Sequence, residues 1–431
     1  MGIVLKEILA VLPEEGRDVV RRTDIYLQGD KIMGIGEEPE GFSADKVIDG
    51  TDRLVIPGLI NAHTHSYMAL LRNVADDLPF EDWLFGHIEP IEDKLTPEDA
   101  YWGACLAILE MMKSGTTCFS DMQMHIHQTS RAVSQSGMRA VISRGLVGSG
   151  DDEAGQVRLR EAYEEKEAWK DQPRLTYFLG PHAPYSCDED FQRIVAAEAS
   201  KNQMGVHIHL SESVNEVENI RSQYGASPIA LAKRAGLFDG LAAAAHCVHV
   251  DEADLDILKE CQVSVITNPA SNMKLGNGFA PVPDMLAKGI NVCIGTDGAA
   301  SNNSLNMFHE MNLLGLIHKG VRQKADCVSA REIFRMATIR GARALGMEEM
   351  TGSIQVGKKA DLAILDLRTP SMTPRNDLLA GLCYSANGSE VETVIIDGEI
   401  TMENRKVLTL DEERIYKEIS RICRRLGIEK E

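Results

Sequence analysis

The chain alternates between helical and extended hydrophobic patterns over most of its length. Segments rich in Ala, Leu, Glu and Lys, such as 100–113 and 251–261, are typical of amphipathic helices. Short apolar runs lie between such segments, and this alternation predicts repeated strand–helix units. Eight apolar runs can be counted, at residues 54–65, 116–121, 139–147, 175–182, 206–211, 241–249, 263–268 and 291–297.

Eight strands joined by helical crossovers match a (β/α)8 TIM-type barrel, whose catalytic groups lie at the C-terminal ends of the strands. An open doubly wound sheet is the alternative, and it would bind its ligand at a single switch point. Polar residues recur at nearly every strand end in this sequence. That recurrence favours the barrel.

Short strands bounded by turn residues are predicted at both ends of the chain. They lie at residues 3–5, 25–27, 31–35, 361–366 and 391–398. We expect the two ends to meet in one small β-sandwich domain made of residues 1–57 and 351–431. The catalytic barrel, residues 58–350, would then be inserted between them.

Composition narrows the class of protein. A chain of 431 residues accommodates a barrel of about 250 residues and a smaller satellite. The net charge of -20 argues against a nucleic-acid partner, and the apolar runs are too short to span a membrane. Nine cysteines are scattered without a CxxC motif, and the N-terminus has no signal-peptide pattern, so we expect a cytoplasmic protein. An enzyme acting on a small molecule is the class that remains.

The first apolar run of the barrel ends in two histidines, His63 and His65, one residue apart. Side chains at i and i+2 of a strand point to the same side, so both imidazoles can face one point, as a metal site requires. A pair of surface histidines is the alternative interpretation of this pattern.

The fifth run also carries two histidines, His207 and His209, on one face. The pattern leaves open which of them is a ligand, although His209 is nearer the C-terminal end. Glu212 follows three residues later and could carry a proton in a reaction. Its alternative role is a cap for the next helix.

Three further strand ends carry polar residues. His246 follows a run of alanines, where a buried core histidine is the simpler interpretation. Asp297 follows a buried run and must either cap a helix or meet a cation, because an unpaired buried carboxylate is costly. His182 lies in a proline-rich, rigid loop and is a candidate substrate contact. Taken together, the strand ends predict a divalent metal site of three imidazoles and one carboxylate, formed by His63, His65, His209 and Asp297, which suits zinc or iron(II).

The run Pro-Gly-Leu-Ile-Asn-Ala-His-Thr-His, residues 57–65, resembles the amidohydrolase superfamily, and the resemblance covers essentially the whole chain. Within that superfamily, the sequence is similar to the 5'-methylthioadenosine/S-adenosylhomocysteine deaminases. The motifs that carry this likeness are Asp82-Trp83-Leu84 with Glu92, and the stretches at residues 143–146, 181–185, 209–212, 245–249, 295–298 and 352–362.

The resemblance implies one metal per subunit, with zinc favoured over iron, held by the four residues above. Relatives with two metals use a modified lysine at the end of the fourth strand, and residues 175–185 contain no lysine. It further implies that Glu92 holds the ribose hydroxyls and that His182 and Glu212 contact substrate. The carboxylate of S-adenosylhomocysteine would meet Arg144 and Arg158, with Arg160 a competitor for the latter role.

The implied reaction is the hydrolytic deamination of adenosine-type nucleosides: 5'-methylthioadenosine, S-adenosylhomocysteine, 5'-deoxyadenosine or adenosine. Asp297 would accept the proton of water, His246 would orient the attacking oxygen, and Glu212 would protonate the purine ring. Asp297 would thus contact substrate as well as metal. A homo-oligomer is also implied.

Two alternatives stay open. One is a related amidohydrolase that acts on a free base or a triazine, such as a guanine or cytosine deaminase or a chlorohydrolase. Glu92 and Arg144 discriminate here, because a bare base has neither ribose nor carboxylate. The other is a non-catalytic scaffold with the same fold, which would purify without stoichiometric metal.

Overall fold

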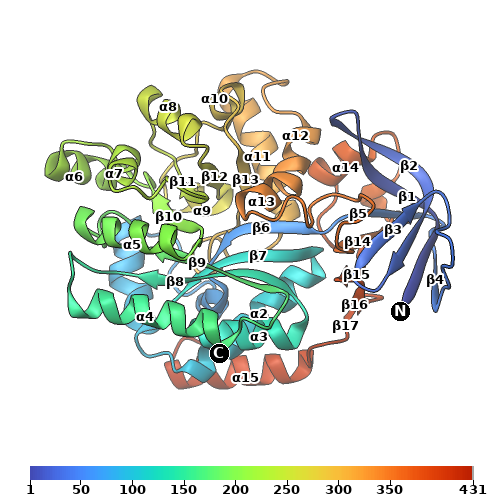
Figure 1. Ribbon diagram of the computed structural model, residues 1–431, viewed down its shortest axis with the longest axis horizontal. Helices are drawn as coiled ribbons and strands as arrows, with labels where there is room; N and C mark the ends of the chain where they lie inside the picture. The colour runs from blue at the N-terminus through green and yellow to red at the C-terminus, as the bar shows by residue number, and fades with distance from the viewer. Residues whose placement is uncertain (430–431) are drawn as a thin grey trace.

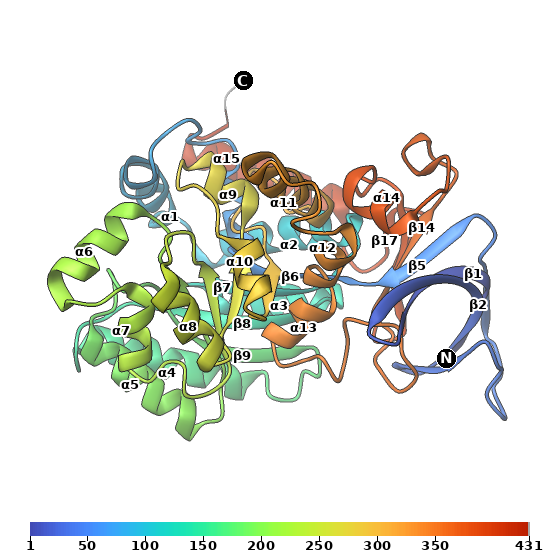
Figure 2. The same ribbon diagram turned by 90° about the horizontal axis from the view of Figure 1, so that it is seen from above.

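The computed structural model describes residues 1–429 and contains two sheets (Figure 1). The first is a nine-stranded, mostly antiparallel sheet in the order β17-β16-β15-β14-β5-β1-β2-β3, with β4 beside β1. Its strands are β1 (Gly2–Glu14), β2 (Arg17–Gln28), β3 (Lys31–Ile35), β4 (Lys46–Asp49), β5 (Arg53–Pro57), β14 (Leu362–Asp366), β15 (Val391–Ile396), β16 (Glu399–Glu403) and β17 (Lys406–Val407). The two chain ends therefore meet in one continuous sheet, which curves around its own apolar core (Figure 2).

The second sheet has eight parallel strands and forms the barrel that the alternating pattern predicts. The strands are β6 (Leu59–Thr64), β7 (Thr116–Gln123), β8 (Arg139–Leu146), β9 (Leu175–Pro181), β10 (Val206–Leu210), β11 (Ala242–His246), β12 (Ser264–Thr267) and β13 (Val292–Ile294). Seven of the eight predicted runs contain one of them, and β7 extends two residues beyond the run at 116–121. The first run, 54–65, divides at Gly58: its first half is β5 of the small sheet, and its second half is β6 of the barrel.

Helices surround the barrel (Figure 1). They are η1 (Ser66–Leu71), η2 (Asp82–Ile88), α1 (Glu89–Glu92), α2 (Pro97–Lys113), α3 (Ile126–Ser136), α4 (Glu153–Ala168), α5 (Glu189–Lys201), α6 (Val214–Tyr224), α7 (Pro228–Arg234), α8 (Glu252–Glu260), α9 (Pro269–Lys274), α10 (Val282–Ala287), α11 (Met307–Arg322), α12 (Ala330–Met336) and α13 (Ile339–Ala344). The predicted amphipathic segments form α2 and α8. Both begin with a capping box, in which the cap residue and the third helical residue satisfy each other's backbone N–H.

The period of two along each strand decides which side chains enter the barrel. In β10, Val206, Ile208 and Leu210 belong to the main apolar core shared with the surrounding helices. The alternate residues, His207 and His209, point into the barrel and contact the ring of His63. The aliphatic residues of β10 pack against the surrounding helices, and the alternating imidazoles therefore point into the barrel interior.

The barrel closes where β13 approaches β6. The backbone N–H groups of Thr296 and Asp297 donate to the carbonyl of His63 at 3.1 and 3.0 Å. Asn61 adds two side-chain hydrogen bonds to Thr296, at 2.7 and 3.0 Å. At Gly295 a Cβ atom would come within 2.8 Å of His63, so only glycine allows this approach. The closure holds Asp297 beside the histidines of β6.

The remaining helices follow β14. They are η3 (Pro370–Met372), α14 (Leu378–Tyr384) and α15 (Glu412–Leu426). α15 packs against α2, so the last segment of the chain returns to the barrel (Figure 1). The proposed division into residues 1–57 with 351–431 and residues 58–350 stays a prediction. Within residues 1–429, no helix has both the length and the apolar character needed to cross a bilayer.

Candidate active site

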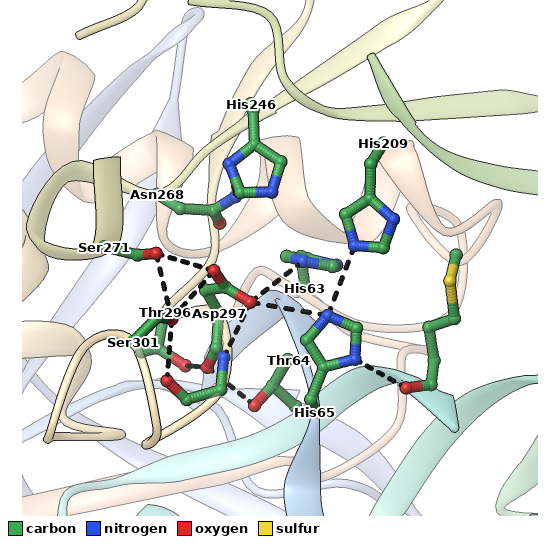
Figure 3. A network of polar contacts seen from close by, with 12 residues as sticks. His63, Thr64, His65, His209, His246, Asn268, Ser271, Thr296, Asp297 and Ser301 are labelled. Carbon is green, nitrogen blue, oxygen red and sulfur yellow. Dashed lines mark hydrogen bonds and ion pairs between the residues drawn. The ribbon is translucent and has the colours of Figure 1, made fainter. Parts of the chain in front are cut away.

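The four predicted metal ligands lie together at the C-terminal ends of β6, β10 and β13: His63 and His209 are near the ends of their strands, and His65 and Asp297 follow theirs (Figure 3). Nε2 of His63 and Nε2 of His65 each lie 3.4 Å from Oδ1 of Asp297. Nε2 of His65 lies 3.2 Å from Nε2 of His209. Donor atoms of His63, His65 and Asp297 lie within 4.8 Å of one another, as do those of His63, His209 and His246. This is the donor set that a divalent transition metal binds.

Two of the histidines are oriented by backbone carbonyls. Nδ1 of His65 donates to the carbonyl of Met122, and Nδ1 of His209 donates to the carbonyl of His182, both at 2.7 Å. With the proton held on Nδ1, the lone pair of Nε2 faces the cluster. Both rings are therefore prepared to act as ligands through Nε2.

The third histidine, His63, is oriented by His207. Its Nδ1 lies 2.9 Å from Nε2 of His207, and Nδ1 of His207 contacts the hydroxyl of Ser120 at 3.2 Å. Nε2 of His63 is buried and makes no hydrogen bond with any of residues 1–429. A buried nitrogen left without a partner is costly, and a metal ion at this point would satisfy it. Between the two histidines of β10, the geometry assigns His209 to the cluster and His207 to its support.

Protonation states in the cluster agree with metal binding. Burial lowers the pKa of His63 to about 4 and holds the pKa values of His207 and His209 well below the ordinary value. Burial alone would raise the pKa of Asp297, but the adjacent His63 and His65 outweigh it and keep that pKa well below its ordinary range. Neutral rings and an ionised carboxylate are the forms that ligate metals.

Hydrogen bonds fix both oxygens of Asp297. Oδ2 accepts from the hydroxyls of Ser271 and Ser301 at 2.6 and 2.9 Å, and Oδ1 accepts from the backbone N–H of Gly298 at 2.7 Å (Figure 3). Ser271 lies on α9, and Gly298 and Ser301 lie in the loop after β13. Gly298 belongs to the motif at residues 295–298, but no sequence pattern singled out either serine. The carboxylate therefore meets the cluster in one orientation.

Glu212 and His246 face each other beside the cluster. Oε2 of Glu212 lies 3.6 Å from Nε2 of His246, whose Nδ1 donates to Oδ1 of Asn272 at 2.8 Å. Asn277 donates to Oε1 of Glu212 at 3.1 Å. Burial, reinforced by the charge of Asp297, raises the pKa of Glu212 to about 8. Glu212 therefore carries a proton at neutral pH, as a general acid must.

The loop after β10 is held by a residue that sequence reasoning missed. Glu216 accepts from the backbone N–H groups of Ser211 and Glu212 at 2.9 and 2.8 Å. Ser213 caps α6 by accepting from the N–H of Glu216, so the cap is Ser213 and not Glu212. The spacing Ser-x-x-Glu at 213–216 is a capping-box signal that could have identified this arrangement.

Three strand ends at the site have left-handed backbone conformations. The φ angles are +53° at Ser211, +72° at His246 and +61° at Asp297. Such angles are uncommon for residues other than glycine, and in globular proteins they concentrate at functional sites. The strain lies where strands turn side chains towards the cluster.

A cavity of about 1070 Å³ opens above the cluster and is lined by most of the predicted substrate contacts. His182, Glu212 and Asp297 lie at its inner end, and Glu92 of α1 also lines it. Oε1 of Glu92 accepts from the hydroxyl of Tyr67 at 2.6 Å, and burial raises the pKa of Glu92. The cavity thus combines the histidine and aspartate cluster with a separate carboxyl group suited to hydrogen bonding.

The predicted arginines differ in position. Arg144, at the end of β8, lines the cavity and makes an ion pair with Glu161 of α4 at 2.9 Å. Arg158 donates to the carbonyl of Val147 at 3.0 Å and does not line the cavity. Arg160 is exposed and does not line it either. The structure therefore brings only Arg144 to the site, and a substrate contact for Arg158 stays a prediction.

Comparisons with known proteins agree with this geometry. The model of the amidohydrolase family matches residues 54–401. The 5-methylthioadenosine/S-adenosylhomocysteine deaminase of Thermoanaerobacter pseudethanolicus is 44% identical to this chain over 428 residues, and the match covers 99% of each chain. The enzyme of the same name from Acetivibrio thermocellus is 46% identical over 432 residues, and the match covers 99% of this chain and all of the relative. The crystal structure of a zinc-bound adenosine deaminase from Xanthomonas campestris superposes with a TM-score of 0.94 at 33% identity, covering 99% of this chain and 98% of that one.

Proposed function

This chain belongs to the amidohydrolase family, and from that premise we propose that it deaminates adenosine-type nucleosides by hydrolysis. Its substrates would include 5'-methylthioadenosine and S-adenosylhomocysteine, which the names of its curated relatives mention. One observation carries the proposal: the buried, protonated Glu212 faces the histidine and aspartate cluster at the inner end of a cavity. A general acid beside a water-activating site is what the replacement of an amino group by water requires.

The proposed metal is one zinc ion, with iron as the alternative, held by His63, His65, His209 and Asp297. The neutral imidazoles of His63 and His209, the ionised carboxylate and the buried Nε2 of His63 support this assignment. Zinc is also bound in the similar adenosine deaminase from Xanthomonas campestris. Such an ion would lower the pKa of an attacking water towards roughly 7.

Different residues around the cluster would carry out the separate proton transfers of the reaction. Asp297, ionised and fixed by Ser271 and Ser301, would accept the proton of the attacking water. Nε2 of His246 would orient the water oxygen towards C6 of the purine. Glu212 would give its proton to the adjacent ring nitrogen as the C6–O bond forms. Asp297 would then return its proton to the amino group while the C6 hydroxyl gives its proton to Glu212. The C6–N bond would break, releasing ammonia and leaving the inosine analogue.

The preference for a nucleoside over a free base rests on Glu92. It lines the same cavity as Glu212, and Tyr67 fixes one of its oxygens while the other stays free to accept. Ribose hydroxyls are suitable donors for it, and a bare base has none. This distinguishes the proposal from a guanine deaminase, a cytosine deaminase or a chlorohydrolase.

A panel of substrates tests the proposal. We expect ammonia release from 5'-methylthioadenosine, S-adenosylhomocysteine, 5'-deoxyadenosine or adenosine, with hypoxanthine nucleosides as products. Guanine, cytosine and a chlorinated triazine should give none. Reaction of bare bases alone would refute the nucleoside assignment.

Metal removal separates an enzyme from a scaffold of the same fold. Dialysis against a chelator should abolish ammonia release, and added zinc should restore it, because the cluster lacks any other electrophile. Full activity in a preparation stripped of metal would contradict the proposed ligand set. Metal content measured in the purified chain gives an independent readout.

His207 should influence metal affinity without being a ligand. Replacing it by Phe removes the contact with Nδ1 of His63, and we expect the zinc dissociation constant to rise about 10- to 100-fold. Competition with a chromophoric chelator measures this constant directly. Ser120→Ala, which alters the next contact outward, is the matched control and should have a smaller effect. An unchanged zinc affinity in His207→Phe would show that His63 does not depend on this contact.

We also propose that the chain is cytoplasmic and forms a homo-oligomer. All nine cysteines are free thiols and six of them are buried, which suits a reducing compartment.

A further inference from the structure

The side of the cavity formed by α4 is acidic. Glu161, Glu164 and Glu165 lie on one face of α4 and line it, as spacings of three and four residues along a helix allow. Among residues 1–429, Arg144 is the only lysine or arginine that lines the cavity. A substrate whose 5' substituent carries a carboxylate therefore approaches mostly like charge, with one guanidinium available to receive it.

The guanidinium of Arg144 already makes hydrogen bonds with other residues of the chain. Nε and Nη2 of Arg144 both donate to Oε2 of Glu161, at 3.1 and 2.9 Å. Nη1 donates to the carbonyl of Gly145 at 2.8 Å and contacts the sulfur of Met124 at 3.0 Å. The edge that would bind a carboxylate through two parallel hydrogen bonds is thus occupied by a carboxylate from the chain itself.

We propose that Glu161 determines substrate specificity: by occupying the donor edge of Arg144, it disfavours nucleosides with a carboxylate on the 5' substituent relative to those with a neutral thioether. The inference rests on the proposed nucleoside deamination and ranks its substrates. 5'-Methylthioadenosine ends in an uncharged methyl group and needs nothing from Arg144. S-Adenosylhomocysteine must displace Glu161 from Arg144 to place its carboxylate there.

The other glutamates of α4 do not compete for Arg144. Glu165 is buried and pairs with His127 at 3.2 Å. Glu164 makes no ion pair among the described residues. The Glu161 side chain is 48% exposed, so its replacement leaves the core intact. Glu161 and Glu164 therefore form a matched pair, with equal charge and the same helix but different contacts with Arg144.

The test compares kcat/KM for S-adenosylhomocysteine with kcat/KM for 5'-methylthioadenosine in each variant. Glu161→Ala should raise this ratio about tenfold, the scale of a hydrogen bond to a charged group. Glu164→Ala removes the same charge and should change the ratio less than about threefold, because a solvated charge is largely screened. Alanine favours helix, and activity on 5'-methylthioadenosine reports that each variant is folded.

A double variant identifies the cause. If Glu161→Ala acts by freeing Arg144, adding Arg144→Gln should remove the increase in the ratio of the two kcat/KM values. A gain that persists in the double variant, or an equal gain in Glu164→Ala, would overturn the proposal in favour of a general charge effect. A ratio unchanged by Glu161→Ala would overturn it as well. Failure of every nucleoside to release ammonia would instead refute the proposed function, so the two failures are distinguishable.

Discussion

Replacing Asp297 by Asn should lower kcat/KM for nucleoside deamination by about 10³- to 10⁴-fold, towards the upper end for loss of a general base. The carboxylate is ionised, lies 3.4 Å from both His63 and His65, and is placed to accept a proton from water. An amide has nearly the same shape but accepts no proton at neutral pH. Initial rates with 5'-methylthioadenosine measure the loss, and metal analysis shows whether the ion is retained.

The hydrogen bonds of Asp297 make the amide a poor substitute in either orientation. Gly298 donates to Oδ1, while Ser271 and Ser301 supply hydroxyls to Oδ2, so an NH₂ group at either position meets a donor. Ser301→Ala is the control: it keeps the charge, removes one hydroxyl, and should cost no more than about tenfold. If Asp297→Asn keeps its metal and more than a tenth of the parental kcat/KM, the base role assigned to Asp297 is wrong.

The strand ends at the centre of the site could be predicted because local patterns determine them. A period of two places His63 and His65 on one side of a strand, and a barrel directs the C-terminal ends of its strands to one face. The same period could not decide between His207 and His209, since both point inward. Their roles depend on depth in the barrel, where His207 meets His63 and His209 meets His65.

The supporting residues could not be predicted because their contacts are made between distant segments. Ser271 reaches Asp297 from α9 and Ser301 reaches it from the loop after β13, and serine is too common for its position to carry a signal. The pairing of Glu161 with Arg144 crosses from a helix to a strand end. Glu161 looks like an ordinary solvated residue of an amphipathic helix until the fold is known.

Replacing Glu212 by Gln should lower kcat by about 10²-fold or more while leaving metal content unchanged, because Glu212 donates a proton but is not a ligand. The amide preserves the size of the side chain and can keep a hydrogen bond with Asn277. It cannot deliver a proton to the purine ring. Single-turnover rates and metal analysis on the same preparation separate the chemical step from loss of the ion.

Glu216→Gln provides the control for this change. Glu216 is also buried, and burial raises its pKa to about 7, but it binds the backbone of residues 211 and 212 and does not line the cavity. We expect a loss of no more than about tenfold, through weaker positioning of the loop. A loss in Glu216→Gln as large as in Glu212→Gln would mean that loop geometry, and not proton donation, accounts for both.

The pH profile gives a second readout that a structural role for Glu212 would not affect. Burial raises the pKa of Glu212 to about 8, and the protonated form is the active acid. Activity should therefore persist below that pH and fall as the pH rises through about 8, because the proton to be donated is lost. The residual activity of Glu212→Gln should lack this alkaline decline, since glutamine does not titrate. An identical decline in parent and variant would assign the titration to another group and remove Glu212 from the role of acid.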